Sequence, residues 1–453
     1  MRRRFSEFFH CRTPHAFRRR AFVFTLLFSL AAIAGLRMRM ADGVSPDGAL
    51  TALSSANAAH LPEAAVLEEP SSDLETQLAR IFAAIGRNQL PLALNQTEHL
   101  LQRYPNYRLA YLIKGDLLLS RGRALSGFGV GAQGQAAEQI DGLRMEALAR
   151  LRGYQEKPPA DAVPRDLLRM SERQKYALLI DTGKSRLYLY ENAPDRPRFV
   201  RDYYVSQGKL GADKMAEGDR RTPLGVYRVT SFIPPEKLAD MYGHGAYPLD
   251  YPNEWDKLQE RGGSGIWLHG TPSDTYSRPP LASDGCVVLS NPDFDALGRY
   301  VEIGETPVII SRAVEWLSLA DWQRERAEVS DALEAWRLAW ESRDTERYLA
   351  FYAPDFRNRG NQDFARFAAQ KSAVNRQKSW ITVQLRQLSI FRLPTPPVLS
   401  ASASAAAAPA ASEVVVATFE QDYASNNLAS VSRKRQYWRR DGGQWKIVYE
   451  SGG

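Results

Sequence analysis

Ser283-Asp284-Gly285-Cys286 is the stretch that decides the fold, because it holds the one cysteine that follows an N-terminal segment with the pattern of an export signal. The chain has 453 residues and 2 cysteines, and the other one, Cys11, precedes that segment. An unpaired thiol is unusual in an oxidising compartment, where cysteines are normally joined in disulfides. Ile266-Trp267-Leu268-His269-Gly270 places a histidine upstream of the thiol. A thiol and a histidine are the minimum set for a cysteine nucleophile and its base.

The net charge of +7 is concentrated at the N-terminus. Residues 1–20 carry seven arginines against one glutamate, so little net charge remains elsewhere and a nucleic-acid partner loses its main support. The apolar run 21–36 follows, which makes residues 1–40 a cytoplasmic basic tail with a signal peptide or signal anchor. Positive charge stays on the cytoplasmic side, so the bulk of the chain is predicted to be exported. Cleavage and anchoring by residues 21–36 both remain open.

A helical module is predicted over residues 73–155, after a linker of residues 41–72 that is rich in Ala, Ser, Gly and Pro. Apolar residues recur at helical spacing, Pro105-Asn106 interrupts the second helix, and Ala110, Tyr111 and Leu118 mark a third. Met145 to Tyr154 is predicted to add one more helix. The pattern resembles one tetratricopeptide unit, which cannot bury its own face. The module is therefore either a small cap or the site of a homodimer.

Two further domains are predicted. Short strand signals bounded by Gly and Pro fill residues 175–312 and end in a closing strand at Thr306 to Ile310, which indicates a sandwich or barrel-like sheet. Residues 321–453 begin with an amphipathic helix over Val329 to Tyr352, and an antiparallel meander follows. Residues 393–412 are predicted to be a disordered loop inserted in that meander. The fold class is thus multidomain: a tetratricopeptide-like α-helical module, a mostly-β catalytic domain and a C-terminal α+β cone.

The candidate base is chosen from four histidines that follow residue 36, namely His60, His99, His244 and His269. The first two lie in the linker and the helical module. His269 stands where a strand end opens into a loop, and that loop can bring Cys286 back over it. Alone, His269 would be taken for a hydrogen-bonded core histidine, but with Ser-x-Gly-Cys we favour a catalytic pair. No metal is predicted, since two histidines without spaced thiols make a poor zinc site.

These residues resemble the YkuD-type L,D-transpeptidase family of bacterial envelopes over residues 175–312. Thr222-Pro223-Leu224-Gly225 is similar to the Thr-Pro-x-Gly turn of that family, and Tyr204 to Gly208 to its strand ending in Ser-x-Gly. The resemblance implies a cysteine that attacks the diaminopimelate carbonyl of a peptidoglycan stem peptide, without a cofactor. Carried over, Cys286 is the nucleophile and His269 the base. The carbonyl of Gly270 orients the imidazole, and the N–H groups of Asp284, Gly285 and Cys286 form the oxyanion hole.

The sequence also departs from the cross-linking members of the family at Asp284 and Val288. It looks more like a proteobacterial subgroup that includes L,D-carboxypeptidases and a hydrolase releasing lipoprotein from peptidoglycan. The acyl acceptor is therefore open between water, another stem peptide and a protein lysine. The implied location is the periplasm, with attachment to the inner membrane if residues 21–36 are kept. The residues predicted to bind substrate are Ser283, Arg278, Tyr247 and His244.

Residues 321–453 resemble the SnoaL or nuclear-transport-factor-like cone, on the pattern of Trp336, Trp340 and Tyr348 in the helical half and Trp445 in the sheet. The same pairing of domains occurs in carboxypeptidases that determine the shape of helical bacteria. We predict a non-catalytic binding or positioning domain, because a fold does not give a function. The competing hypotheses are a catalytically degenerate peptidoglycan-binding scaffold, an amidase that releases protein from peptidoglycan, and an envelope protein that acts through its flanking modules alone.

Overall fold

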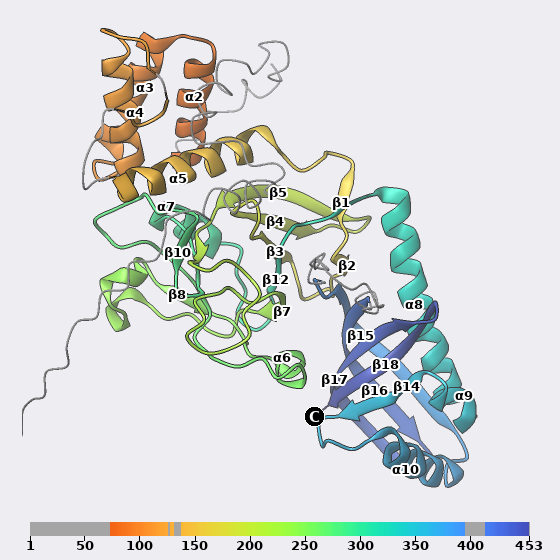
Figure 1. Ribbon diagram of the computed structural model, residues 1–453. Helices are drawn as coiled ribbons and strands as arrows, with labels where there is room; N and C mark the ends of the chain where they lie inside the picture. The colour runs from red at the N-terminus through yellow and green to blue at the C-terminus, as the bar shows by residue number, and fades with distance from the viewer. Residues whose placement is uncertain (1–72, 126, 131–136, 395–412, 453) are drawn as a thin grey trace, which may run out of the picture. The chain divides into compact units, whose positions relative to one another are not determined.

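The computed structural model describes residues 73–125, 127–130, 137–394 and 413–452 (Figure 1). The predicted export segment 21–36, the linker 41–72 and nearly all of the predicted loop 393–412 lie outside this range. Among the helices that are described, none combines the length and the apolar character that a membrane crossing demands.

The helical module has four helices where the sequence indicated three and a short addition. They are α2 (Leu74–Gly86), α3 (Leu90–Arg103), α4 (Arg108–Leu119) and α5 (Ala137–Gln155). α5 packs against both α2 and α4. A single tetratricopeptide unit needs a neighbour to bury its face, and α5 supplies that neighbour within the same chain. Of the residues that marked the third helix, Ala110 is buried and Tyr111 and Leu118 are exposed; Leu109, Ile113 and Leu117 supply the rest of its buried face. A homodimer through this module stays a prediction.

A five-stranded mixed sheet forms the centre of the next domain, in the order β5-β4-β3-β12-β7. Its strands are β3 (Tyr176–Asp181), β4 (Arg186–Asn192), β5 (Pro197–Tyr204), β7 (Gly225–Arg228) and β12 (Pro307–Ser311). The predicted closing strand is in fact internal: β12 runs parallel to β3 and antiparallel to β7. Every residue of β12 is buried, as expected for a strand with neighbours on both edges.

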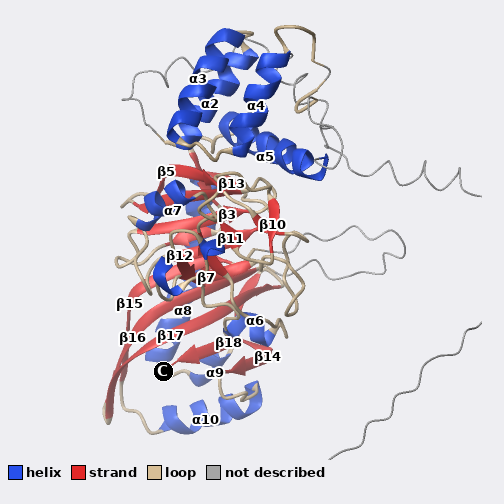
Figure 2. Ribbon diagram, turned by 90° about the vertical axis from the view of Figure 1, so that its left-hand side faces the viewer, coloured by secondary structure: helices blue, strands red, loops and turns tan. Residues whose placement is uncertain are grey.

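Two smaller sheets carry the predicted site. One has the order β11-β9-β8, from β8 (Ala246–Pro248), β9 (Trp267–His269) and β11 (Val287–Val288). The other pairs β6 (Gln207–Gly208) in parallel with β10 (Leu281–Ser283). α7 (Asn291–Gly298) follows β11, and α6 (Glu254–Leu258) lies between β8 and β9 in the chain. Figure 2 labels both helices. β9 ends at His269 and the parallel β11 begins directly after Cys286, so the pairing brings the two residues to neighbouring strands.

The C-terminal domain is a six-stranded sheet with helices, in the strand order β14-β18-β17-β16-β15-β2. Its own elements are α8 (Leu319–Glu341), α9 (Thr345–Leu349), α10 (Phe364–Arg376), β14 (Tyr352–Asn358), β15 (Ile381–Arg392), β16 (Val414–Ser425), β17 (Leu428–Asp441) and β18 (Gln444–Gly452). The helix predicted over 329–352 was wrong at both ends. α8 begins at Leu319, ten residues before the predicted start, and Ser318 caps it by accepting from the N–H of Asp321. The helix ends before Arg343, which has a left-handed conformation (φ 63°).

The segment between the helical module and the catalytic domain was assigned to neither domain by the sequence, and the structure gives it a role. β2 (Leu167–Arg169) becomes the edge strand of the C-terminal sheet beside β15, and β1 (Ala162–Pro164) pairs with β13 (Trp316–Ser318). The indole N–H of Trp322 on α8 donates to the carbonyl of Leu167 at 2.9 Å. The C-terminal domain is thus completed by residues that precede the catalytic domain in the chain.

Aromatic side chains build the core of the C-terminal domain, and one of them allows a direct test. Trp336 is 1% exposed and contacts Trp340, Tyr348, Phe419 and Trp438. Trp336→Ala should lower the free energy of unfolding by about 3–5 kcal/mol, because it leaves a large cavity. Trp380 is 48% exposed, so Trp380→Ala is the matched control and should cost no more than about 0.5 kcal/mol. Denaturant unfolding measures both; equal losses would contradict the assignment of the core.

Candidate active site

The turn that carries Cys286 requires a glycine before the thiol. Gly285 has φ +132°, and a Cβ there would lie 2.8 Å from the carbonyl oxygen of Arg221. The hydroxyl of Ser283 accepts from the N–H of Gly285 at 3.1 Å and donates to the carbonyl of Cys286 at 2.6 Å. Ser-x-Gly-Cys is therefore a self-bonded turn, and the serine and the glycine both serve the conformation of the backbone.

The side chain of Thr222 fixes the backbone of this turn. Its buried hydroxyl donates to the carbonyl of Gly285 at 2.9 Å and accepts from the N–H of Gly208 at 3.0 Å. Gly208 has no room for a side chain, because a Cβ would lie 2.9 Å from Cα of Arg221. Thr222 therefore connects the Thr-Pro-x-Gly motif both to the Ser-x-Gly motif and to the Ser-x-Gly-Cys turn. This connection is a physical reason for the three motifs to occur together in one sequence.

His269 is held as a neutral imidazole with a fixed tautomer. Its Nδ1–H donates to the carbonyl of Gly270 at 2.7 Å, which leaves Nε2 as the basic nitrogen. The ring is 3% exposed and the ring of Tyr242 packs edge-on against it, with centroids 5.0 Å apart. Burial lowers the pKa of His269 to about 4; the Gly270 carbonyl opposes this shift and the charge of Arg278 adds to it. At neutral pH this histidine can accept a proton.

The thiol of Cys286 is half-buried and is also neutral at rest. Burial raises the pKa of Cys286 above its ordinary value, and the N–H of Trp267 and the charge of Arg278 partly offset that rise. The hydrogen bond that the thiol makes is to the carbonyl of Gly265, at 3.3 Å. The resting pair is therefore thiol and imidazole, and attack on a carbonyl requires the thiol proton to leave Gly265 for Nε2 of His269.

The predicted oxyanion hole needs a correction. The N–H of Gly285 is already bonded to Ser283, so it does not point to an open site. In the described structure the N–H groups of Asp284 and Cys286 take part in no hydrogen bond. Two of the three predicted donors are thus available for a developing oxyanion, which is the number that such holes usually supply through the backbone.

The predicted substrate-binding residues do not form one group. The hydroxyl of Ser283 is used within the turn. Tyr247, by contrast, is buried in the core of the domain: its ring packs against the buried Phe294 on one side and the exposed Phe232 on another, which does not leave it open to a substrate. His244 is exposed, and its Nδ1 lies 2.8 Å from the carboxylate of Asp295.

Arg278 is the predicted substrate-binding residue that does face the thiol. It lies in the loop between β9 and β10, where one guanidinium nitrogen, Nη2, donates to the carbonyl of Ala282 at 3.0 Å. Its Nε is buried and has no partner among the described residues. Its charge acts on both Cys286 and His269. A carboxylate of a bound ligand could take the free donor, since a guanidinium matches a carboxylate in geometry.

Sequence reasoning missed three supporting residues. Gly265 accepts the thiol hydrogen bond, and Tyr242 packs on the imidazole. Asn291 accepts from the N–H of His244 at 3.2 Å and fills the space beside Gly270, where a Cβ would collide with it. Tyr242 and Asn291 had a signal in the sequence, since Tyr242 stands two residues before His244 and Asn291 five residues after Cys286. The described residues contain no group of three His, Cys, Asp or Glu placed to hold a metal ion.

Comparison with known proteins identifies two regions. Residues 175–310 match the family model of the L,D-transpeptidase catalytic domain, YkuD, and residues 328–451 match that of the Cds6 C-terminal NTF2-like domain. No curated protein matches the chain. The structure of Bd1075 from Bdellovibrio bacteriovorus is 28% identical, covers 65% of this chain and 98% of its own, and superposes with a TM-score of 0.55.

A second similar structure shares the fold of this chain. It is Pgp2 from Campylobacter jejuni, described as a helical cell shape determining protein. It is 23% identical, the match covers 65% of this chain and 96% of that one, and the TM-score is 0.52.

The neutral resting pair predicts the pH dependence of thiol reactivity. His269 stays neutral from pH 5 to 8 because its pKa is about 4, so the rate of alkylation of Cys286 should follow the thiol alone. A raised thiol pKa means less thiolate at any given pH, so the midpoint should lie above that of free glutathione. Iodoacetamide labelling, quantified on the Cys286 peptide by mass spectrometry, measures this midpoint. A midpoint below that of glutathione would instead indicate a thiolate–imidazolium pair.

The Cys286 turn should not tolerate a side chain at Gly285. In Gly285→Ala the new Cβ meets the carbonyl of Arg221 and the backbone leaves its left-handed conformation, so the turn has to rearrange. We expect alkylation of Cys286 to lose its parental pH profile. Gly262→Ala is the control, because a Cβ at Gly262 meets nothing within 4 Å. Parental profiles for both variants would show that the turn is not constrained as described.

Proposed function

Since residues 175–310 are a YkuD-type L,D-transpeptidase catalytic domain and residues 328–451 an NTF2-like domain, we propose that the protein is a cysteine enzyme acting on peptidoglycan stem peptides. The thiol of Cys286 attacks the carbonyl of diaminopimelate and passes its proton to Nε2 of His269. The amide bond breaks, the proton goes to the leaving amine, and a thioester remains on Cys286. Water or an amine then cleaves that thioester and restores the thiol.

One observation carries this proposal. The Nδ1–H of His269 is bound to the carbonyl of Gly270, and β9, which carries this histidine, is paired with β11, which begins directly after Cys286. A base with a fixed tautomer is thereby held on the strand beside the nucleophile, which is the arrangement that acyl transfer through a thioester requires.

The surroundings of the thiol supply the remaining parts. The N–H groups of Asp284 and Cys286 can bind the oxyanion of the tetrahedral intermediate. The guanidinium charge of Arg278 can attract a carboxylate of the stem peptide, which is an anionic substrate. The raised pKa of Cys286 keeps the thiol protonated until a substrate arrives, so it resists chance oxidation in the periplasm.

The setting of the enzyme is part of the same proposal. The basic tail and the apolar run 21–36 support export to the periplasm, with attachment to the inner membrane if the run is not cleaved. The NTF2-like domain would position the enzyme on the cell wall. A role in cell shape is included in the proposal because Pgp2, which is described as determining helical cell shape, has a similar fold.

A second candidate is a catalytically degenerate scaffold that binds peptidoglycan without cleaving it. The observation in its favour is that the thiol bonds to Gly265 and the N–H of Gly285 to Ser283, so that neither is directed at a substrate in this state. The scaffold predicts that loss of the thiol changes nothing in binding or in cells. A catalytic role for Cys286 predicts the opposite.

The test uses purified muropeptides and the Cys286→Ala and Cys286→Ser variants. We expect the parent protein to convert tetrapeptide stems and both variants to lose activity by at least about 1000-fold, as for other nucleophiles. Mass spectrometry with and without an added amine separates the acceptors: tripeptide alone indicates a carboxypeptidase, a diaminopimelate cross-link a transpeptidase. An amidase would instead release lipoprotein from peptidoglycan. Unchanged product profiles in the variants would refute the proposal, whereas a parent protein that binds peptidoglycan and converts no stem peptide would favour the scaffold.

A further inference from the structure

The loop that carries Arg278 is shared between the catalytic domain and the helical module. The ring of Tyr276 packs edge-on against Tyr104, with centroids 5.1 Å apart, and joins the apolar core of the module. The hydroxyl of Ser277 accepts from the N–H of Leu109 in the first turn of α4, at 2.9 Å. That N–H has no partner within its helix, so the loop supplies the bond that a capping residue normally makes.

α5 contacts the same loop from a second direction. A Cβ at Gly142 would lie 2.8 Å from Cγ of Pro279, so the backbone of the helix touches the proline ring directly. Glu146 lies one turn further along α5 and is buried; burial raises its pKa well above the ordinary value, and the backbone N–H of Arg278 opposes that rise. Pro279 is therefore held by the backbone of the helical module, and Arg278 follows next to it in the same loop.

The catalytic domain holds the other side of the loop. The hydroxyl of Tyr204 donates to the carbonyl of Arg278 at 2.7 Å, and that of Ser206 to the carbonyl of Pro279 at 2.6 Å. The guanidinium of Arg150, on α5, stacks on the ring of Tyr204 at 4.1 Å from its centroid. The helical module thus also contacts the residue that fixes the backbone of Arg278.

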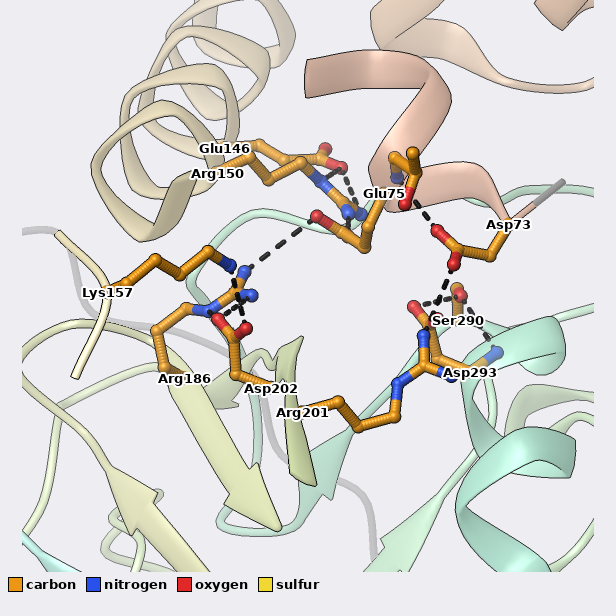
Figure 3. A network of polar contacts seen from close by, with 11 residues as sticks. Asp73, Glu75, Glu146, Arg150, Lys157, Arg186, Arg201, Asp202, Ser290 and Asp293 are labelled. Atoms are coloured by element: carbon orange, nitrogen blue, oxygen red, sulfur yellow. Dashed lines mark hydrogen bonds and ion pairs between the residues drawn. The ribbon is translucent and has the colours of Figure 1, made fainter. Parts of the chain in front are cut away.

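A network of buried charges keeps the module in register with the catalytic domain. Figure 3 shows Glu75 of α2 between Arg150 of α5 and Arg186 of β4, and Arg186 in turn on Asp202 of β5. Arg150 and Arg186 are each 3% exposed. Such pairs add little net stability, but a shift that separated them would leave buried charges without partners, which is strongly unfavourable. The network therefore favours one position of α5 over the loop.

We propose that the helical module is a positioning element of the active site: through Tyr276, Ser277 and Pro279 it fixes the guanidinium of Arg278 beside Cys286. This inference rests on the proposed role of Cys286 as the nucleophile. It assigns Arg278 a second task besides binding a carboxylate, namely to stabilise the thiolate as it forms. Residues more than a hundred positions upstream thereby act on the reactivity of the thiol without touching it.

The reactivity of Cys286 is the natural readout, because charges reach the thiol from several elements. Arg278 and Lys214 favour the thiolate, whereas Asp284 in the same turn opposes it. His269 is neutral above a pH of about 4 and contributes no charge at neutral pH. Displacing Arg278 should therefore raise the midpoint of alkylation, and it should do so without any substrate present.

Gly142→Ala and Gly115→Ala form a matched pair for the test. Both add a methyl group inside a helix of the module, where alanine is the better helix former. At Gly142 the methyl meets Pro279, whereas at Gly115 nothing lies within 4 Å. Iodoacetamide labelling of Cys286 in the full chain is followed against pH, with Arg278→Gln as the reference for complete loss of the charge.

We expect Gly142→Ala to move the midpoint upward by about 0.5–1 unit, towards that of Arg278→Gln, which slows labelling at pH 7 by about 3–10-fold. Gly115→Ala should match the parent. A parental profile for Gly142→Ala beside a shifted Arg278→Gln would overturn the proposal, and so would a parental profile for Arg278→Gln. If thermal unfolding shows that Gly142→Ala does not fold, Ser277→Ala replaces it under the same criteria. A shifted profile in a protein that converts no muropeptide would support the inference and refute the proposed function separately.

Discussion

The hydroxyl of Thr222 is the interaction on which the site depends. It lies between the N–H of Gly208 and the carbonyl of Gly285, so it joins the end of β6, the Thr-Pro-x-Gly turn and the turn that carries Cys286. The last of these turns has a backbone conformation that only glycine adopts at low cost, and it needs a partner for each polar group that it buries. Because Thr222 supplies one of these partners, it fixes three segments that are distant in sequence relative to one another.

Burial changes the pKa values of Cys286 and His269 more than nearby charges do. Burial keeps both Cys286 and His269 neutral at rest, which is why the thiol can bond to the carbonyl of Gly265 while the histidine stays a base. Activation then depends on what enters the site and on the one guanidinium that faces it, that of Arg278. The loop that carries Arg278 is held in turn by contacts from the helical module and from β5, and the role that we propose for the module rests on these contacts.

Local sequence predicted the centre of the site and failed where packing decides. The role of Gly270 could be predicted because the histidine bonds to the very next residue, at 2.7 Å. The burial of Tyr247 could not be predicted, because a tyrosine in a three-residue strand fits a cleft or a core equally well, and only its packing with Phe294 and the rest of the core decides between them. The helix over 329–352 was misplaced because aromatic residues continue past Glu341 at a helical spacing, while the break rests on the conformation of Arg343.

The sequence by itself picked out Cys286 and His269 as the candidate nucleophile and base, because each stands in a short motif, Ser-x-Gly-Cys and His-Gly, and the glycine before the thiol predicted a tight turn. It also determined that three folded regions follow a basic, apolar N-terminus. Only the tertiary structure decided that β2 completes the C-terminal sheet, that the N–H of Gly285 is bonded to Ser283, and that the loop of Arg278 contacts α4 and α5. The physical reason is that these features are contacts between surfaces, and the spacing of residues along one chain does not specify which surfaces will meet.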